Sequence, residues 1–345
     1  MQMFSTLNKN IVFQRWSKRA AYIFLAVWAA AFVICCLLSN GNACKIVLYV
    51  GLAVWALIGI YRSYLNKSIG EGTLHLIVYA VFTVFALSYL YIFFWGVTSG
   101  FKTQTEIAVY PFDLPTEWHF RNYIDVFSHL EVSGFGFFGM LGNSLYFSLL
   151  GSFCLCMISS MLAYVTNKFR FPGSRLFMPI LLFTMMFPIY GSGGSMYELL
   201  LKLGFVNSRL QILLSFNGMN VYYIYFHATY SNLSWSYAEA AYIDGANDFT
   251  VYFRVMFPQI INLFGALYLI TWVGDWNNYS SALIYLTKLP TLAGGIYMFE
   301  LNMVQHARRD LLYAAYMITA IPPLLLFIFF NKVLTSNISI GGIKE

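Results

Sequence analysis

Charged side chains are scarce in this chain of 345 residues. They make up 10% of it, whereas soluble domains carry about 25%. Hydrophobic residues make up 59% and aromatic residues 19%. So little charge excludes an ordinary soluble enzyme and predicts an all-α polytopic membrane protein. The formal net charge of +6 does not indicate nucleic-acid binding, because the basic residues are scattered between hydrophobic segments.

The sequence also lacks the motifs of common enzyme chemistry. It contains no G-x-x-x-x-G-K-[ST] loop, so it cannot hold the phosphates of ATP in the usual way. It has no H-E-x-x-H, no zinc-type spacing of Cys and His, and no G-x-S-x-G. Ionisable residues within the apolar segments are too few and too scattered to form an acid–base pair. We therefore expect no catalytic site, no metal and no cofactor bound by this chain, and energy supplied by a partner.

Cysteine is rare, and its positions fit neither a disulfide framework nor a metal site. The five cysteines lie in or beside apolar segments, which indicates small packing residues: Cys35, Cys36, Cys44, Cys154 and Cys156. The first apolar run is long, and Cys35–Cys36–Leu37–Leu38 offers no small-residue cleavage site. We expect a membrane span there, not a cleavable signal peptide.

Long hydrophobic runs, in contrast, are abundant. A helix needs about 20 apolar residues to cross about 30 Å of hydrocarbon. Eight segments qualify, at about residues 20–38, 45–61, 74–98, 139–165, 175–191, 209–230, 259–281 and 311–331. If the N-terminus is inside, most of the 20 lysines and arginines fall in inner segments. The pattern predicts that both termini are cytoplasmic and that the long loop at 99–138 is outside.

One polar segment, Glu239–Pro258, is longer than a simple connection between two spans requires. Ser236-x-x-Glu239 predicts a capping box at the start of a short helix. The small residues Ala240 and Ala241 continue this helix. Gly245 is predicted to stop it, because a left-handed residue costs glycine least.

A second short helix is expected after this glycine. Asn247 or Asp248 can cap it, and Pro258 is expected to end it. Its apolar stripe has helical spacing and consists of Phe249, Tyr252, Phe253 and Met256. Two short helices of this kind cannot bury their own apolar residues, so we expect them to dock into a partner. The alternative without a partner is a capped helix–turn–helix that only connects two spans.

This segment resembles the coupling loop of ABC-importer permeases, which in that family sits in a cleft on the ATPase subunit. The resemblance rests on Glu239-Ala240-Ala241, Asp244-Gly245-Ala246 and Pro258. It places the coupling loop at 235–258. It covers about residues 74–345 and implies a six-helix type I ABC-importer permease core. Residues 1–73 depart from the family pattern and form an N-terminal extension with a hairpin of two transmembrane helices.

Polar and aromatic residues at the end of the seventh span resemble carbohydrate permeases of the maltose type, in particular their second permease subunit. Aromatic rings stack on sugar faces, and Asn and Asp bond to hydroxyls. Together with two polar residues of the interrupted sixth span, they form a candidate translocation path: Asn217, Asn220, Trp272, Asp275, Trp276, Asn277 and Tyr279. Trp and Tyr also gather at membrane interfaces because they are amphipathic, and this alternative stays open.

The resemblance also implies roles and partners. Glu239 would position the first coupling helix, Gly245 would permit the turn, and a socket on the ATPase would be filled by Phe249, Tyr252 and Phe253. The expected partners are two ABC ATPase subunits that bind ATP and Mg²⁺, a similar but non-identical permease, an extracellular solute-binding protein and the lipid bilayer. Importers of another solute, such as a peptide or a phosphate ester, and a membrane scaffold or enzyme remain alternatives.

A glycine-rich run before the fourth span needs a separate interpretation. Gly134-Phe135-Gly136-Phe137-Phe138-Gly139 matches G-x-G-x-x-G by letter. A dinucleotide site would also need a preceding strand, a following soluble helix and an acidic residue about 20 positions further on. We interpret the run as a glycine–aromatic entry into the next span.

Overall fold

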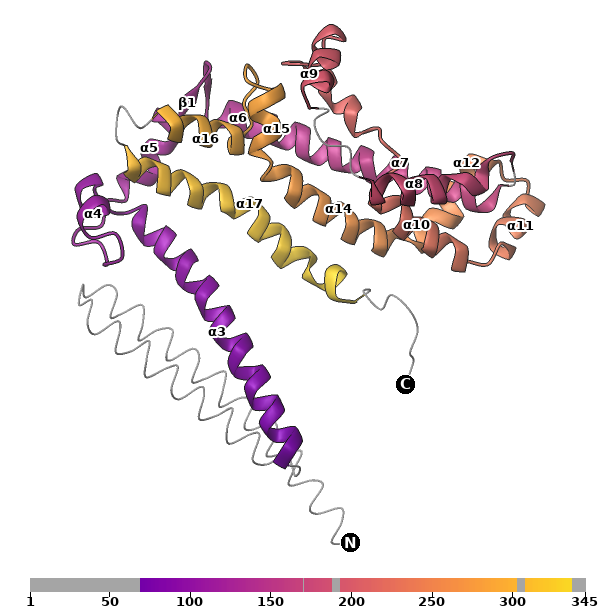
Figure 1. Ribbon diagram of the computed structural model, residues 1–345, viewed down its shortest axis with the longest axis horizontal. Helices are drawn as coiled ribbons and strands as arrows, with labels where there is room; N and C mark the ends of the chain where they lie inside the picture. Colours follow the sequence, from indigo (N-terminus) through magenta and orange to yellow (C-terminus); the bar gives the residue numbers. More distant parts are fainter. Residues whose placement is uncertain (1–68, 170, 188–192, 303–307, 337–345) are drawn as a thin grey trace. The chain divides into compact units, whose positions relative to one another are not determined.

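The computed structural model describes residues 69–169, 171–187, 193–302 and 308–336 (Figure 1). These residues are mainly helical, which confirms the all-α prediction. The predicted spans at 20–38 and 45–61, and with them Cys35, Cys36 and Cys44, lie outside the described residues. The chain divides into two compact units, Met1–Tyr123 with Arg308–Ala314, and Ile124–Ala307 with Ala315–Glu345.

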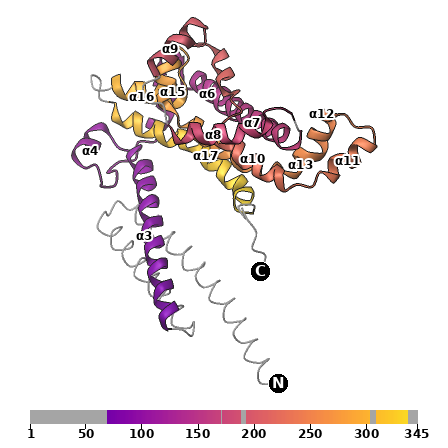
Figure 2. The same cartoon turned by 45° about the vertical axis from the view of Figure 1, so that its right-hand side comes forward.

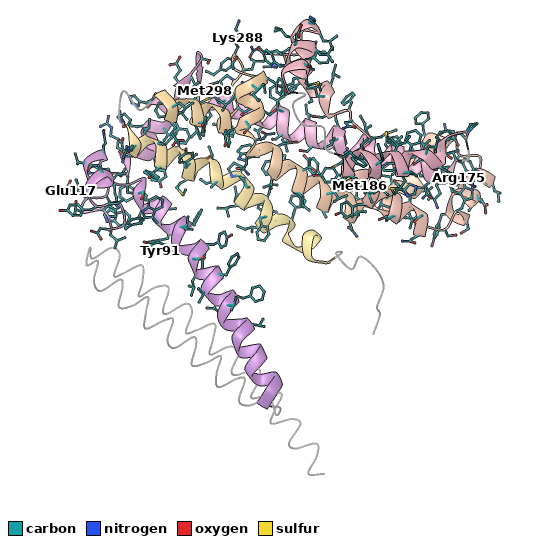
Figure 3. The ribbon with its side chains drawn as sticks, viewed as in Figure 1. Tyr91, Glu117, Arg175, Met186, Lys288 and Met298 are labelled. Carbon is teal, nitrogen blue, oxygen red and sulfur yellow. The ribbon has the colours of Figure 1, made fainter. Side chains whose placement is uncertain are left out.

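The first unit is built on the long helix α3 (Ile69–Ser99). Its part Val81–Ser99 is long and apolar enough to cross a membrane, which confirms the span expected at 74–98. Large apolar side chains such as Phe82 and Leu90 are exposed on it, and Tyr91 projects from its surface (Figure 3). An exposed apolar helix surface suits contact with lipid.

A compact loop follows α3. The short helix α4 (Gln104–Val109) has a capping box between Thr103 and Glu106, and α5 (Arg121–His129) begins after the loop. Lys102 is buried, and its Nζ donates to the carbonyls of Tyr110 and Pro111 at 3.0 Å each. The loop after the span is therefore held by its own hydrogen bonds.

The centre of the second unit is one continuous apolar helix over Phe137–Lys168. It consists of α6 (Phe137–Leu145), the π-helical turn η1 (Tyr146–Leu150) and α7 (Gly151–Lys168). This confirms the span predicted at 139–165. Helices α10 (Val221–Asn232) and α14 (Ile261–Trp276) pack against α7, as Figures 1 and 2 show.

The predicted sixth span is interrupted, as its polar residues indicate. A 3₁₀-helix η3 covers Arg209–Ser215, and α10 starts only at Val221. Asn220 caps α10, because its Oδ1 accepts the backbone N–H of Tyr222 at 2.8 Å. Of the span predicted at 175–191, the structure describes residues 175–187, with the 3₁₀-turn η2 (Ser174–Leu176) and helix α8 (Phe177–Met186), and the rest lies outside the described residues.

The remaining elements complete the described residues. They are the hairpin strands β1 (Glu131–Val132) and β2 (Phe135–Gly136), and the helices α9 (Gly193–Lys202), α15 (Tyr279–Tyr285), α16 (Leu292–Asn302) and α17 (Arg309–Ser336). The glycine-rich run forms the end of the hairpin and leads into α6, with Ser133 and Gly134 at positive φ in the turn. This agrees with an entry into the next span.

Within the described residues, three helices are long and apolar enough to cross a membrane: Val81–Ser99, Phe137–Lys168 and Arg309–Phe330. A bent pair, Asp248–Gln259 and Ile261–Trp276, would make a fourth span. The two parts of this pair meet at an angle of 79°. The bend lies between the predicted coupling loop and helix α14.

Candidate functional site

The coupling loop begins with helix α11 (Ser236–Ile243). The predicted capping box is wrong. Trp235 already has helical backbone angles, so the N–H of Glu239 donates to the Trp235 carbonyl at 3.1 Å and is not available to Ser236. The Oγ of Ser234 instead accepts the N–H of Ser236 at 3.3 Å. Glu239 and Ala240 are exposed, so both can contact a partner.

Gly245 ends α11 in the way that the sequence predicts. Its φ is +84°, in the left-handed region. The N–H of Ala246 donates to the carbonyl of Ala241, and the N–H of Gly245 donates to that of Tyr242, both at 3.0 Å. These two bonds form a Schellman motif. Any L-residue at this position would be strained by about 1–2 kcal/mol, so glycine fixes the joint.

The second helix of the loop is capped by Asn247, whose Oδ1 accepts the N–H of Thr250 at 2.8 Å. It runs without a break through α12 (Asp248–Thr250), the π-helical segment η4 (Val251–Met256) and α13 (Phe257–Gln259). Pro258 is exposed within its last turn, one residue before the end of the helix.

A hydrogen bond ties the two short helices together. The Oη of Tyr242 donates to Oδ1 of Asp248 at 2.7 Å. Burial and this bond raise the pKa of Tyr242 above its usual value, so the phenol stays protonated and remains a donor at neutral pH. The angle between the two helices is therefore fixed by Tyr242 as well as by the glycine turn.

The apolar stripe of the second helix is divided between two faces. Phe249 is 71% exposed, and Phe253 is exposed on the same face one turn later. Tyr252 is 4% exposed and Met256 is buried, on the adjoining side of the helix that packs inward. The expectation that Tyr252 fills a socket on a partner is corrected, because its side chain is buried within this chain. Ile243 of α11, which the sequence analysis did not single out, is 86% exposed.

Tyr252 joins the loop to the packed helices. Its Oη lies 3.0 Å from Oγ of Ser160 in α7, and the same Oγ lies 3.1 Å from Oη of Tyr230 in α10. The hydroxyls of Ser160, Tyr230 and Tyr252 thus connect three elements in a buried core. A network of satisfied hydrogen bonds of this kind fixes the relative positions of the elements that carry it.

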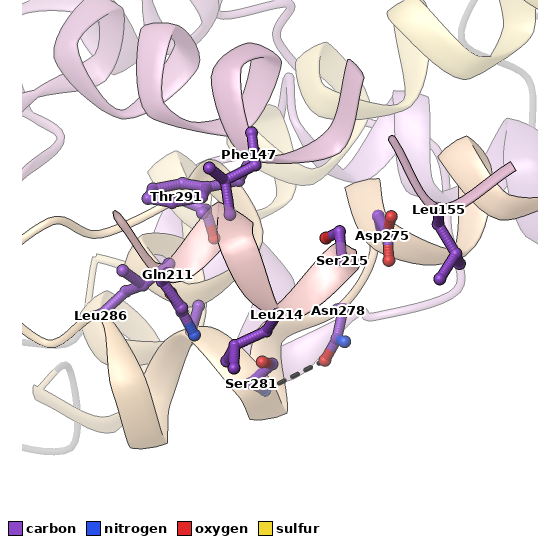
Figure 4. A pocket seen from close by; sticks show the side chains of 12 residues that line it. Phe147, Leu155, Gln211, Leu214, Ser215, Asp275, Asn278, Ser281, Leu286 and Thr291 are labelled. Atoms are coloured by element: carbon purple, nitrogen blue, oxygen red, sulfur yellow. Dashed lines mark hydrogen bonds between the residues drawn. The ribbon is translucent and has the colours of Figure 1, made fainter. Parts of the chain in front are cut away.

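The residues predicted for a translocation path do not form a single site. A first cavity of about 270 Å³ is lined by polar side chains including Gln211, Ser215, Asp275 and Asn278 (Figure 4). The Oδ2 of Asp275 accepts the Oγ–H of Ser152 at 2.7 Å. This carboxylate stands among hydroxyl and amide groups from α7, η3 and the end of α14.

A second cavity of about 300 Å³ contains Trp276, Asn277 and Tyr279. Tyr279 stacks on Tyr297 with ring centroids 4.7 Å apart. The Nε1 of Trp276 donates to the carbonyl of Thr319 at 3.2 Å, which holds the indole in place. The cavity therefore places the exposed ring of Tyr279 beside the amide of Asn277.

Three of the predicted path residues line neither of these two cavities. Trp272 is buried in the packing of α14. Asn220 caps α10, and its Nδ2 donates to Ser159 Oγ and to the carbonyl of Asn217. Asn217 in turn accepts the N–H of Met219. The structure gives Asn217 and Asn220 a role in building the break before α10.

Sequence reasoning missed Gln211 as a cavity residue because it lies in the predicted sixth span ahead of the polar residues that mark its interruption. A polar amide within an apolar segment is the signal that could have identified it. The free cysteines Cys154 and Cys156 are half-buried and buried, respectively, which confirms the packing interpretation for these two.

Comparisons with known proteins agree with this architecture. The diacetylchitobiose uptake system permease protein NgcG of Streptomyces coelicolor is 26% identical over 254 residues, covering 72% of this chain and 82% of that protein. The arabinooligosaccharides transport system permease protein AraQ of Bacillus subtilis is 25% identical over 266 residues, covering 76% and 93%.

A solved bacterial ABC transporter involved in the import of the acidic polysaccharide alginate shares the fold. Its TM-score is 0.64 at 22% identity, covering 78% of this chain and 99% of that chain. Residues 155–340 match the family described as binding-protein-dependent transport system inner membrane component. This match includes more than half of the chain. In addition, the described residues contain three helices, or four with the bent pair, that are long and apolar enough to cross a membrane. The chain therefore belongs to this family of multi-pass inner-membrane permeases.

Proposed function

We propose that this chain is one permease subunit of an ATP-driven importer of carbohydrate. It pairs with a similar but non-identical permease, and the translocation path runs between the two. Relatives named for diacetylchitobiose and arabinooligosaccharides support a carbohydrate. The observation that carries the proposal is the coupling loop, a glycine-jointed pair of helices with exposed Ile243, Phe249 and Phe253.

The coupling loop receives the motion of separate ATPase subunits, which bind ATP and Mg²⁺. Large apolar side chains exposed on a polar loop favour a protein partner. When the ATPases close, the loop moves, and the hydroxyl group of Tyr252 carries the movement to Ser160 and Tyr230 in α7 and α10. The packed helices then rock as rigid bodies and switch the path from inward-facing to outward-facing.

The topology follows from the distribution of Lys and Arg. Both termini and the coupling loop lie in the cytoplasm, where an ATPase reaches them. A solute-binding protein docks on the outer face, where the loop at 99–138 lies. Residues 1–73 add two spans to the permease domain at 74–345.

A phosphate ester is the second candidate solute. The sn-glycerol-3-phosphate transport system permease protein UgpE of Pectobacterium atrosepticum is 25% identical over 250 residues, covering 71% of this chain and 89% of that protein. However, no lysine or arginine among the described residues lines either of the two cavities. An anionic solute without a cationic partner in its site is disfavoured, so carbohydrate is preferred.

The test substitutes Gly245→Leu in the complete transporter, with Gly173→Leu as the matched control. Both glycines have positive φ, +84° and +91°, and an added Cβ meets no atom within 4 Å at either position. The two variants therefore have similar local strain. Gly245→Leu should insert normally but lose ATPase association and uptake, whereas Gly173→Leu should keep both. Equal uptake in the two variants would remove the coupling assignment.

A further inference from the structure

We infer that the first cavity is a subsite for one neutral sugar unit and that it excludes acidic sugars. The inference rests on the proposed function as a carbohydrate importer and assigns a selectivity to this subunit. The inference rests on the unpaired amide oxygen of Gln211, the carboxylate of Asp275, and the lining and volume of the cavity.

Gln211 supplies the first argument. It is 9% exposed and lines the cavity. Within the described residues, its Oε1 has no hydrogen-bond partner. A buried amide oxygen is normally paired, so an unpaired one on a side chain that lines a cavity points to a donor from a bound molecule. A sugar hydroxyl is such a donor.

Asp275 and Ser215 supply the second argument. Oδ2 of Asp275 is already held by Ser152 Oγ at 2.7 Å, which orients the carboxylate. A Cβ added at Gly151 would lie 3.1 Å from Ser215 Oγ and 3.9 Å from Asp275 Oδ2. Glycine at this helical position therefore leaves the space beside the two polar groups clear. Carboxylates accept strong, charge-assisted hydrogen bonds from hydroxyls.

The cavity also has an apolar side, and its size limits the ligand. Phe147, Leu155 and Leu214 line it together with the polar groups (Figure 4). A ring with polar edges and apolar faces fits such a lining. The volume of about 270 Å³ is slightly below the usual range of ligand pockets, about 300–1,000 Å³. It suits one sugar unit of a longer chain, not a whole oligosaccharide.

Charge decides between neutral and acidic sugars. Among the described residues, Asp275 is the only charged residue that lines the cavity, and no lysine or arginine lines it. A uronate or a sugar phosphate would place a second negative charge beside Asp275 without compensation, which is strongly unfavourable in a partly buried site.

The test introduces Ser215→Cys into the complete transporter and measures how fast the new thiol reacts with charged reagents. These reaction rates report the charge and the occupancy of the cavity. A cationic and an anionic methanethiosulfonate reagent are compared, and labelling of the parental chain is subtracted. The cationic reagent should react faster, and Asp275→Asn in the same chain should reduce the cationic-to-anionic rate ratio about tenfold. Ser280→Cys, next to the cavity residue Ser281 but not in the lining, is the control whose ratio should not change.

Occupancy is tested with defined saccharides supplied through the binding protein. Diacetylchitobiose or arabinotriose should slow labelling of Ser215→Cys, and digalacturonate should not. A rate ratio that is insensitive to Asp275→Asn, or protection by digalacturonate, would overturn the inference. Either result would leave the coupling assignment intact, because that depends on Gly245→Leu and not on the cavity.

Discussion

The coupling loop precedes the first residue of α14, the cavities are lined by residues at and just after its last turn, and the two regions are built in opposite ways. The helix has 16 residues and a rise of about 24 Å. At the N-terminal end of α14, the coupling loop exposes Ile243 and Phe249 and buries Tyr252. At the C-terminal end of α14, Asp275 lines a cavity, and the indole of Trp276 donates a hydrogen bond to the carbonyl of Thr319. The first arrangement suits docking of a protein, and the second suits passage of a polar solute.

This contrast predicts that the two ends fail differently when they are altered. A variant of the coupling loop should release the ATPase and abolish uptake. A variant of the cavities should keep the ATPase bound and change only the solute dependence of uptake. Three substitutions, each with a matched control, measure this separation.

The largest effect is expected from Phe249→Ala. Burial of a phenylalanine in a partner contributes about 2 kcal/mol, so its loss should weaken ATPase binding about 30-fold. Phe112 has nearly the same exposure, 70% against 71%, but lies in the loop predicted to be outside. Phe112→Ala should leave ATPase binding unchanged. Affinity measured on purified permease dimers checks both values, and equal effects of the two variants would contradict the docking role.

A smaller effect is expected from Tyr279→Ala in the second cavity. Loss of its stacking surface removes about 0.5–1.5 kcal/mol of an aromatic contact, so the KM for uptake should rise about threefold to tenfold. ATPase association should not change. Tyr225→Ala, which alters a similarly exposed tyrosine outside both cavities, is the control. If Tyr279→Ala released the ATPase, the functional separation of the two ends would be wrong.

The smallest effect is expected from Tyr252→Phe, which removes only the hydroxyl that bonds to Ser160. The cost should be about 1 kcal/mol of unfolding free energy, seen as a modest fall in the thermal unfolding midpoint in detergent. ATP hydrolysis per transported solute should also rise, because the loop is held less firmly. Tyr237→Phe alters an exposed tyrosine in α11 and should change neither quantity. Identical behaviour of the two variants would exclude an anchoring role for Tyr252.

The sequence predicted those parts of the coupling loop that depend on local chemistry. Gly245 is left-handed because no other residue adopts that conformation as cheaply, and Asn247 caps the helix that follows it. The cap before α11 was misplaced, because the backbone of Trp235 starts the helix earlier than the sequence signal suggests. A shift of one residue is enough to disconnect Ser236 from Glu239.

The parts that could not be predicted depend on contacts between distant segments. Whether Tyr252 faces inward is decided by Ser160, 92 positions earlier. The first cavity combines Gln211 with Asp275, whose carboxylate is oriented by Ser152, 123 positions away. Periodicity identifies an apolar stripe or a polar interruption, but only the packing of α7 and α14 decides which side chains meet.

The most direct test of the account is the side of the membrane on which the coupling loop lies and what covers it. Ile243→Cys, at a position that is 86% exposed, is labelled with a membrane-impermeant maleimide, with the parental chain as blank. We predict labelling in inside-out vesicles and not in intact cells, and protection when the ATPase is bound. Phe112→Cys should show the reverse sidedness and no protection. Labelling of Ile243→Cys from outside the cell, or unchanged labelling with the ATPase bound, would contradict the account.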